Sequence, residues 1–305
     1  MDMSSERDVV GYGRNPPQAD WPGGARLAIN FVINYEEGSE QSYLRGDDRE
    51  ETALTEGAGP VVPAGAPDLG ARSMFEYGSR VGFWRLWRQF ESRGLAVTVF
   101  GCAEALERNP EAAAAICGSD HDVCGHGWRW VEHFRLGEDE ERDHIARAVA
   151  SLKETVGARP LGWYCRYAPS VNTRRLLVEE GGFLYDSDAY NDELPYWTVV
   201  EGAPHLIVPY SLTNNDTQFK RGNMAQGDDF FGFIKGAVDM LRDEGAETPK
   251  MMSVGLHCRL IGHPSRAAGL ARLLDYIQNF DDIWVTHRVD IARHWCERHP
   301  YQAAG

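Results

Sequence analysis

Several side chains capable of acid–base chemistry stand directly after apolar runs in this sequence of 305 residues. In a parallel β/α barrel the catalytic groups lie at the carboxyl ends of the strands, so polar residues in these positions are expected to meet at one mouth. Seven residues follow the runs in this way: Glu36, Glu37, His126, Arg166, Asp186, Asp188 and His257. Together they predict a single catalytic site.

Such a set could add water across an amide bond. A carboxylate beside a second carboxylate tends to have a raised pKa, so Glu36, next to Glu37, is the candidate general base near neutral pH. His257 is the candidate general acid that protonates the leaving nitrogen. Arg166 would orient Asp186 or Glu36 through charge-assisted hydrogen bonds.

The remaining groups would bind and polarise the substrate. His126 and the indole N–H of Trp130 could stabilise an oxyanion, and aromatic walls suit a flat five-membered ring. The residues that we expect to contact the substrate are Tyr35, Trp128, Trp130, Tyr167 and Asp188.

Each of these residues also has a structural explanation. An isolated Glu-Glu pair is usually a solvated turn, a histidine at a strand end is often structural, and Trp128 and Trp130 could be core aromatics. Arg166 could simply form an ion pair with a nearby acid. A carboxylate pair directly after a buried strand is nevertheless costly unless it serves a site, which favours catalysis.

The elements that must position these groups alternate along the chain. Near-continuous apolar runs predict buried strands at 26–34, 96–101, 121–125, 160–165, 183–188, 205–210, 250–258 and 282–287. Amphipathic spacing predicts helices at 82–94, 103–116, 138–157, 172–182, 228–245 and 265–280. Strands that alternate with helices pair in parallel, so the fold class is α/β, a distorted parallel (β/α) barrel of about seven units.

Length and composition indicate one domain over residues 1–305. With 43% hydrophobic residues the chain can bury a full core, and no repeat or linker divides it. The stretch 1–24 is rich in Gly and Pro and predicts an irregular arm that packs on the body. Residues 38–73 have weak periodicity and predict a long surface excursion over one end of the barrel, where it could help to form a binding site.

The net charge of −15 disfavours nucleic acid as a partner, because such partners need clustered Lys and Arg. No apolar run reaches the length of a membrane span, and the polar N-terminus lacks the regions of a signal peptide. We therefore expect a soluble, cytoplasmic protein with no membrane partner. The six cysteines form no Cys-x-x-Cys pair, which fits reduced intracellular thiols.

The order and spacing of these residues, over most of the chain, resemble the polysaccharide deacetylase family (the NodB-homology domain). Five segments stand at the family's motif positions: 34–37, 126–130, 166–169, 186–188 and 256–257. The resemblance implies that Glu36 is the general base and that Glu37 and His126 occupy positions of metal ligands.

The resemblance breaks at one ligand position. A catalytic zinc site needs about three protein ligands, but Trp130 stands where the family has its second histidine, and an indole N–H cannot bind a cation. With only Glu37 and His126 left, we predict no metal and no cofactor. Zinc is the alternative, if the loop bulged so that His133 replaced the missing ligand.

These departures resemble one branch of the family, the allantoinases of purine degradation, which hydrolyse a hydantoin ring. Segments similar to that branch lie at 11–17, 34–38, 76–80, 162–164, 172–176 and 253–260. The resemblance implies ring opening of a cyclic ureide such as allantoin without a metal, with a small-molecule amide or ureide as the partner. It also implies a homo-oligomer, a tetramer.

Two alternatives stay open. Within hydrolysis, the chain could be a cyclic imide hydrolase or a metal-dependent N-deacetylase of the same family. From another class, it could be an inactive barrel that binds a small molecule. An acid, a base and an arginine at one rim favour the enzyme.

Overall fold

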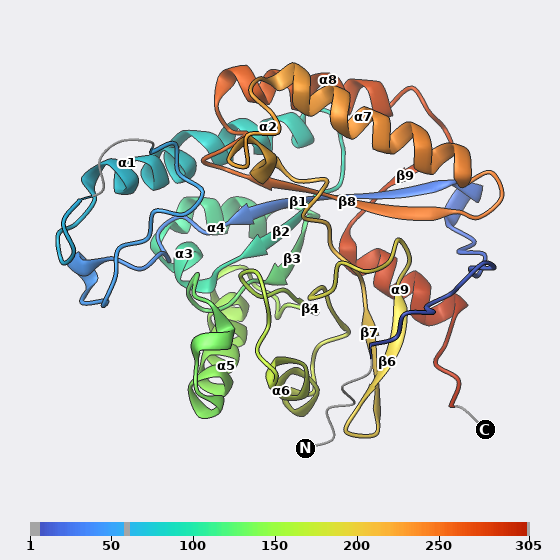
Figure 1. Cartoon of the computed structure of the whole chain (residues 1–305), viewed down its shortest axis with the longest axis horizontal. Helices are drawn as coiled ribbons and strands as arrows, with labels where there is room; N and C mark the ends of the chain where they lie inside the picture. Colours follow the sequence, from blue (N-terminus) through green and yellow to red (C-terminus); the bar gives the residue numbers. More distant parts are fainter. Residues whose placement is uncertain (1–6, 58–61, 304–305) are drawn as a thin grey trace.

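The computed structural model describes residues 7–57 and 62–303, and a curved sheet runs through the middle of this part of the chain (Figure 1). Its strands are hydrogen-bonded in the order β6-β7-β5-β4-β3-β2-β1-β8, and β9 also pairs with β1. The strands are β1 (Leu27–Tyr35), β2 (Thr98–Gly101), β3 (Asp122–Gly125), β4 (Gly162–Trp163), β5 (Tyr185–Asp186), β6 (Tyr196–Val200), β7 (Ala203–Ile207), β8 (Lys250–His257) and β9 (Ile283–Val285). The predicted distorted α/β barrel is confirmed, as a sheet curled into a half-barrel with helices around it.

β1 is covered on both faces, and all of its residues are buried. β8 pairs with it over 27–34 on one side. The other side is shared, since β9 pairs with 27–29 and β2 with 32–35. This register sets Asn34 opposite His257, so the residues that follow β1 emerge beside the end of β8.

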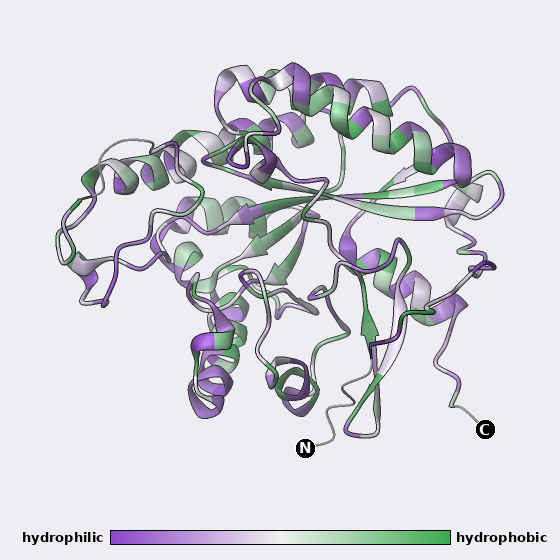
Figure 2. Ribbon diagram, viewed as in Figure 1, coloured by the Kyte–Doolittle hydropathy of each residue, from purple (hydrophilic) through white to green (hydrophobic). Residues whose placement is uncertain are grey.

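Helices cover the outside of the sheet. They are α1 (Leu69–Tyr77), α2 (Phe83–Glu91), α3 (Ala103–Arg108), α4 (Pro110–Cys117), α5 (Glu138–Thr155), α6 (Thr173–Glu180), α7 (Gly227–Glu244), α8 (Pro264–Ile277) and α9 (Arg288–Arg298). α7 and α8 pack together beside β1 and β8 (Figure 1). Along the chain, α3 and α4 come after β2, α5 after β3 and α6 after β4. Figure 2 shows hydrophobic residues along the central strands and hydrophilic residues on the outward surfaces of α5, α7 and α8.

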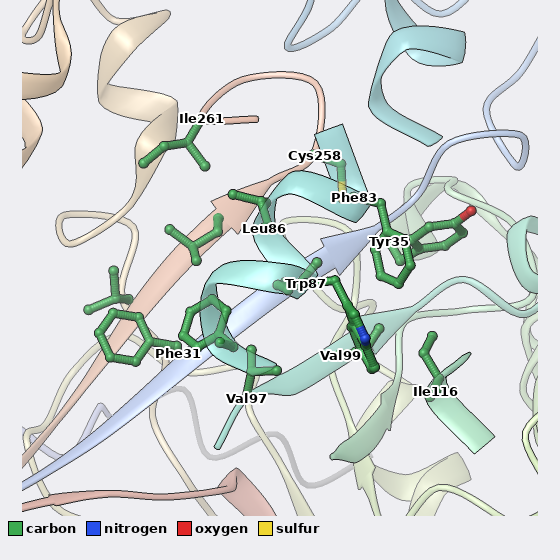
Figure 3. Packing of buried hydrophobic residues seen from close by; sticks show 14 of the residues in the cluster. Phe31, Tyr35, Phe83, Leu86, Trp87, Val97, Val99, Ile116, Cys258 and Ile261 are labelled. Atoms are coloured by element: carbon green, nitrogen blue, oxygen red, sulfur yellow. The ribbon is translucent and has the colours of Figure 1, made fainter. Parts of the chain in front are cut away.

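Part of the largest core cluster packs α2 against the sheet (Figure 3). Phe31 of β1 packs on Phe90 with ring centres 5.3 Å apart, and Tyr35 packs edge-on against Phe83 at 5.0 Å. Trp87 of α2 joins the same cluster. These contacts fix the end of β1 and hence the position of the residues that come after it.

The sheet is not purely parallel, which corrects the sequence prediction. β6 runs antiparallel to β7, because Glu201 and Gly202 both take positive φ, at 49° and 80°, and reverse the chain in a tight turn. Along the free side of β8 in the described chain, the Gly255 N–H donates to the Asn214 carbonyl at 2.9 Å. A loop, rather than a strand, therefore covers that side of the half-barrel.

Three elements were not predicted, namely α1, β6 and α9. The helix expected over 103–116 is two helices, α3 and α4. Pro110 has no N–H to donate to the preceding turn, and the Asn109 side chain caps α4 by accepting the Ala112 N–H at 3.2 Å. The helix therefore restarts at Pro110.

The described part of the arm, 7–24, contains a single 3-10 turn at Pro22–Gly24 and otherwise no helix or strand. Trp21 is buried and packs against Trp284, His294 and Trp295. The arm thus lies against α9 and β9. No helix within 7–57 and 62–303 has the length and apolar character needed to cross a membrane.

A buried arginine ties the strands together inside the half-barrel. Arg288, at the start of α9, is fully buried. Its guanidinium donates to Ser187 Oγ and Ser253 Oγ, each at 2.6 Å, and to the carbonyls of Val208 and Pro209, each at 2.5 Å. These partners come from segments that follow β5 and β7 and from β8, so Arg288 links both sides of the opening in the sheet.

Replacing Arg288 with methionine should lower the free energy of unfolding by at least about 3 kcal/mol, because several buried acceptors lose their donor. Urea titration of both proteins measures the difference. Arg272→Met is the control, since this arginine is half-exposed and pairs with Asp228 at the surface, and its change should stay within about 0.5 kcal/mol. Equal losses in the two variants would contradict the assigned role of Arg288.

Candidate active site

A cavity of about 280 Å³ opens at the carboxyl ends of the central strands. Ala53 and Leu54, from the excursion after β1, form part of its wall, together with Leu212. The polar and aromatic side chains that line it include Glu36, His126, Trp130, Tyr164, Arg166, Tyr167, Tyr210, Thr217 and His257. Six predicted site residues therefore meet here: Glu36, His126, Trp130, Arg166, Tyr167 and His257.

Glu36 lies between two imidazoles and one guanidinium. It is 1% exposed, and its Oε1 is 3.3 Å from His126 Nε2 and 3.6 Å from His257 Nε2. Its Oε2 is 2.7 Å from a terminal nitrogen of Arg259. A carboxylate in this position can exchange a proton with a molecule in the cavity.

The pKa of Glu36 is lowered, not raised as predicted. Burial by itself raises this pKa, but Arg259, His257 and His126 outweigh burial and bring it below its ordinary value. The prediction considered only the neighbouring carboxylate of Glu37 and missed Arg259, a cation that contacts both glutamates. Glu36 is therefore ionised at neutral pH, which is the form a general base must have.

His257 is held by a buried carboxylate. Its Nδ1 is 2.6 Å from Oδ1 of Asp216, whose Oδ2 accepts the backbone N–H of His257 at 2.6 Å and that of Ile261 at 3.2 Å. Burial lowers the pKa of His257, but Asp216 and Glu36 outweigh it and raise the pKa above its ordinary value. The proton of Nε2, which faces Glu36, is thus retained to higher pH.

His126 is oriented by a backbone carbonyl. Its Nδ1 is 2.8 Å from the carbonyl oxygen of Tyr164, which can only accept, so Nδ1 carries a proton and Nε2 points at Glu36. The ring also stacks on the Tyr164 ring, with centres 5.2 Å apart. This arrangement leaves Nε2 as the only ring nitrogen available to the cavity.

Glu37 does not reach the cavity, which corrects the prediction that it joins the other side chains at the mouth. Its Oε1 accepts from Arg259 at 3.1 Å, and its Oε2 accepts the Glu36 backbone N–H at 3.2 Å. Burial raises the pKa of Glu37 and Glu36 adds to this effect, against the opposing charge of Arg259. Because successive side chains of an extended segment alternate in direction, only one of the two glutamates can face the cavity.

Arg166 lines the cavity but has other partners than predicted. Its guanidinium is 2.5 Å from Glu51 and donates to the Trp130 carbonyl at 3.0 Å. The guanidinium carbon also lies 3.7 Å from the centre of the Trp130 ring. Arg166 therefore does not orient Asp186 or Glu36, because its guanidinium forms an ion pair with Glu51 of the excursion.

Two aromatic residues predicted to contact substrate lie elsewhere. Tyr35 is fully buried in the core under α2, and its hydroxyl accepts from the Asn109 side chain at 2.7 Å. Trp128 lies beneath Arg147, whose guanidinium carbon is 3.4 Å from its ring centre, and lines a separate cavity beside His144. The structural explanation therefore holds for Trp128, whereas Trp130 lines the site.

Asp186 and Asp188 also lie away from the cavity. Asp186 is 2.7 Å from Arg174 of α6 and 2.8 Å from His205 of β7, and Asp188 accepts the Cys165 backbone N–H at 2.9 Å. The prediction that both lie at the mouth is wrong. β5 directs Asp186 toward α6, and the hydrogen bond from the Cys165 backbone N–H holds the Asp188 carboxylate against the segment that follows β4.

Sequence reasoning missed Asp216, Arg259 and Thr217. Arg259 stands two residues after His257, inside the segment 253–260 that resembles the allantoinases, so a signal was available. Asp216 and Thr217 lie in a short 3-10 helix, Asp216–Phe219, with no strand pattern to place them. Thr217 Oγ1 is buried at the cavity and has no hydrogen-bond partner among the described residues, so it is free to bind a ligand.

The residues at the family's ligand positions do not fit a zinc ion. Glu37 is already bound to the Arg259 cation, and Trp130 presents a ring and no lone pair. His133, the substitute that we considered, is buried with Nδ1 3.1 Å from Glu141. Within 7–57 and 62–303, no group of three or more His, Cys, Asp and Glu side chains could hold a metal ion.

Comparisons with known proteins identify the family of this chain. The polysaccharide deacetylase family model matches residues 71–184. A Schizosaccharomyces pombe protein assigned to the polysaccharide deacetylases is 36% identical over 321 residues, which cover 99% of this chain and 100% of that protein. The chain belongs to the polysaccharide deacetylase family. It is a hydrolase of this family, acting on carbon–nitrogen bonds other than peptide bonds.

Two solved structures of the polysaccharide deacetylase fold are similar over almost their whole length. One is a Pseudomonas aeruginosa PAO1 protein assigned to the same family, and the other is PuuE allantoinase. Each is 47% identical, with a TM-score of 0.93, and the match covers 97% of this chain and 99% of the other. The family model, the relative and both structures therefore agree on the fold.

Gly78, which follows α1, permits the position of Glu37 in this deacetylase-family chain. A Cβ at Gly78 would overlap the Glu37 carboxylate, although its φ of −57° suits any residue. Gly78→Ala should therefore lower the free energy of unfolding by about 1–3 kcal/mol, as in overpacked cores. Urea titration measures this loss.

Gly232→Ala is the matched control, because Gly232 lies in α7 with open space around its Cβ position. That variant should be unchanged or more stable by up to about 1 kcal/mol. A Gly78 variant that behaves like the Gly232 variant would contradict the close contact with Glu37.

Proposed function

We propose that this chain opens the ring of a small cyclic ureide such as allantoin by hydrolysis of a C–N bond without a metal. One observation carries the proposal: an ionised carboxylate, Glu36, faces an imidazole, His257, at 3.6 Å on the wall of a small cavity. The surroundings shift the pKa values of the two groups in opposite directions, since they lower the pKa of Glu36 and raise that of His257. A base and an acid at one carbon–nitrogen bond are what amide hydrolysis requires.

In the proposed reaction, Glu36 takes a proton from water as the water oxygen bonds to the ring carbonyl carbon. Negative charge moves to the carbonyl oxygen, where the Trp130 N–H would stabilise it. His126 would add an Nε2–H donor in its imidazolium form, since Nδ1 already donates to the Tyr164 carbonyl. His257 gives its Nε2 proton to the ring nitrogen as the C–N bond breaks. The net change adds hydroxyl to carbon and hydrogen to nitrogen.

The cavity favours a small ring over a sugar polymer. A volume of about 280 Å³ is near the lower end for small-molecule sites. Tyr164 and Tyr210 supply aromatic walls for a flat ring, and Thr217 Oγ1 supplies a buried hydroxyl for a ring carbonyl or N–H. A polymer would instead need an open groove along the ends of the strands, where Ala53 and Leu54 of the excursion now stand.

The proposal predicts ring opening of allantoin that persists in the presence of a chelator. Allantoin, hydantoin, succinimide and an N-acetylated sugar should be assayed side by side, each with and without EDTA. Ring opening of succinimide alone would make the chain a cyclic imide hydrolase. Activity on the sugar that disappears with EDTA would replace the proposal by a metal-dependent N-deacetylase.

Glu36→Gln should lower kcat/KM on the preferred substrate by about 1000-fold, because the amide cannot accept a proton from water. The variant should still bind substrate in isothermal titration, since the shape of the cavity is kept. If the wild type turns over none of the four compounds and the variant binds them equally well, the chain is a binding protein.

The basic limb of the pH profile of kcat/KM should report His257, whose proton is required and is lost as the pH rises through its pKa. Asp216→Asn removes the negative charge that raises this pKa. The basic limb should therefore move to lower pH in the variant. An unchanged limb would show that His257 is not the acid.

A further inference from the structure

Arg259 is a fully buried cation outside the cavity lining. One terminal nitrogen is 2.7 Å from Glu36 Oε2, and the other is 3.1 Å from Glu37 Oε1. Its Nε donates to the Leu54 carbonyl at 3.0 Å. Two of the guanidinium nitrogens therefore donate hydrogen bonds, to Leu54 and Glu37, and the third contacts Glu36 as an ion pair without hydrogen-bond geometry.

This arrangement resolves a conflict of charge. Two neighbouring carboxylates in a buried site repel each other, and one of them would ordinarily take up a proton. A guanidinium stays protonated at any working pH, and its planar fork can serve two acceptors at once. With Arg259 between them, Glu36 can remain ionised although Glu37 is its neighbour.

The surroundings of Arg259 are built for a desolvated guanidinium. Its Cζ lies 4.4 Å from the centre of the Phe75 ring and 4.8 Å from that of Trp130. Aromatic faces stabilise cations, and do so more strongly where water is excluded. Trp130, which takes the place of a histidine ligand, therefore offers a π face to a cation that belongs to the chain itself.

We propose that Arg259 is a positioning residue for the hydrolysis proposed above, and that it serves as a built-in cation which keeps the Glu36 carboxylate ionised and aimed into the cavity. It does not touch the substrate. It acts through Glu36, in a site where Glu36, Glu37 and the Trp130 ring together bind a guanidinium. The kinetic part of this inference rests on the proposed function, whereas the binding part does not.

The test is chemical rescue of Arg259→Ala with guanidinium chloride at millimolar concentration. Guanidinium should raise the melting temperature of this variant along a saturating curve, because it fills the vacated site. Sodium chloride at equal ionic strength should not do so. The wild type, whose site is filled, and Arg272→Ala, which removes an exposed arginine that also lies over an aromatic ring, should show no saturable rise.

The kinetic measurement uses the preferred substrate of the wild type. Arg259→Ala should lose about 100-fold in kcat with little change in KM, because a misplaced base slows the chemical step and Arg259 does not itself line the cavity. Guanidinium should restore part of kcat over the same concentrations that raise the melting temperature. A purely structural arginine would not give a rescued kcat.

Retention of kcat by Arg259→Ala, or the absence of any saturable effect of guanidinium, would overturn the inference. Should this variant fail to fold, Arg259→Lys decides: it keeps the charge but not the fork, and kcat should fall about 10-fold, whereas an unchanged kcat would overturn the inference. If the wild type hydrolyses none of the test compounds, the proposed function fails. The melting curves still decide whether guanidinium occupies this site.

Discussion

The ion triad of Arg259, Glu36 and Glu37 is the constraint on which the site depends. Two carboxylates and a guanidinium are buried together at the end of β1, and the loss of Arg259 would leave two carboxylates without a cation and without water. The triad also sets the chemistry, because it keeps Glu36 as a carboxylate facing His126 and His257. The proton affinities of the candidate base and acid are thereby separated.

Much of the surrounding fold serves to enclose this triad. The excursion after β1 contributes the Leu54 carbonyl to Arg259 and Glu51 to Arg166, so the long irregular segment is part of the site and not a peripheral loop. Gly78 lets α1 approach Glu37, and at Gly82 a Cβ would overlap the Cys258 carbonyl at the end of β8. Helices and strands therefore meet at van der Waals contact around the buried charges.

Enclosure also supports the proposal of a small substrate rather than a polymer. The family fold places hydrolytic residues at the carboxyl ends of its strands, and here the excursion and the loop around Leu212 reduce the space to a cavity of about 280 Å³. The side chains at the family's metal-ligand positions also differ. An arginine cation lies against Glu37 and an indole replaces a ligand, so the chain's own charges surround the reacting groups.

The sequence by itself determined the alternation of strands and helices, the family, and the residues that end β1, β3 and β8. These follow from local patterns, because an apolar run predicts a buried strand and its next polar residue predicts the rim. Only the tertiary structure decided which rim residues face the cavity. Asp186 turns to α6, Tyr35 enters the core, and Arg259 reverses the predicted shift of the Glu36 pKa. The physical reason is that direction and proton affinity depend on partners distant in sequence, such as Asp216 and Arg259, whose contacts no local pattern contains.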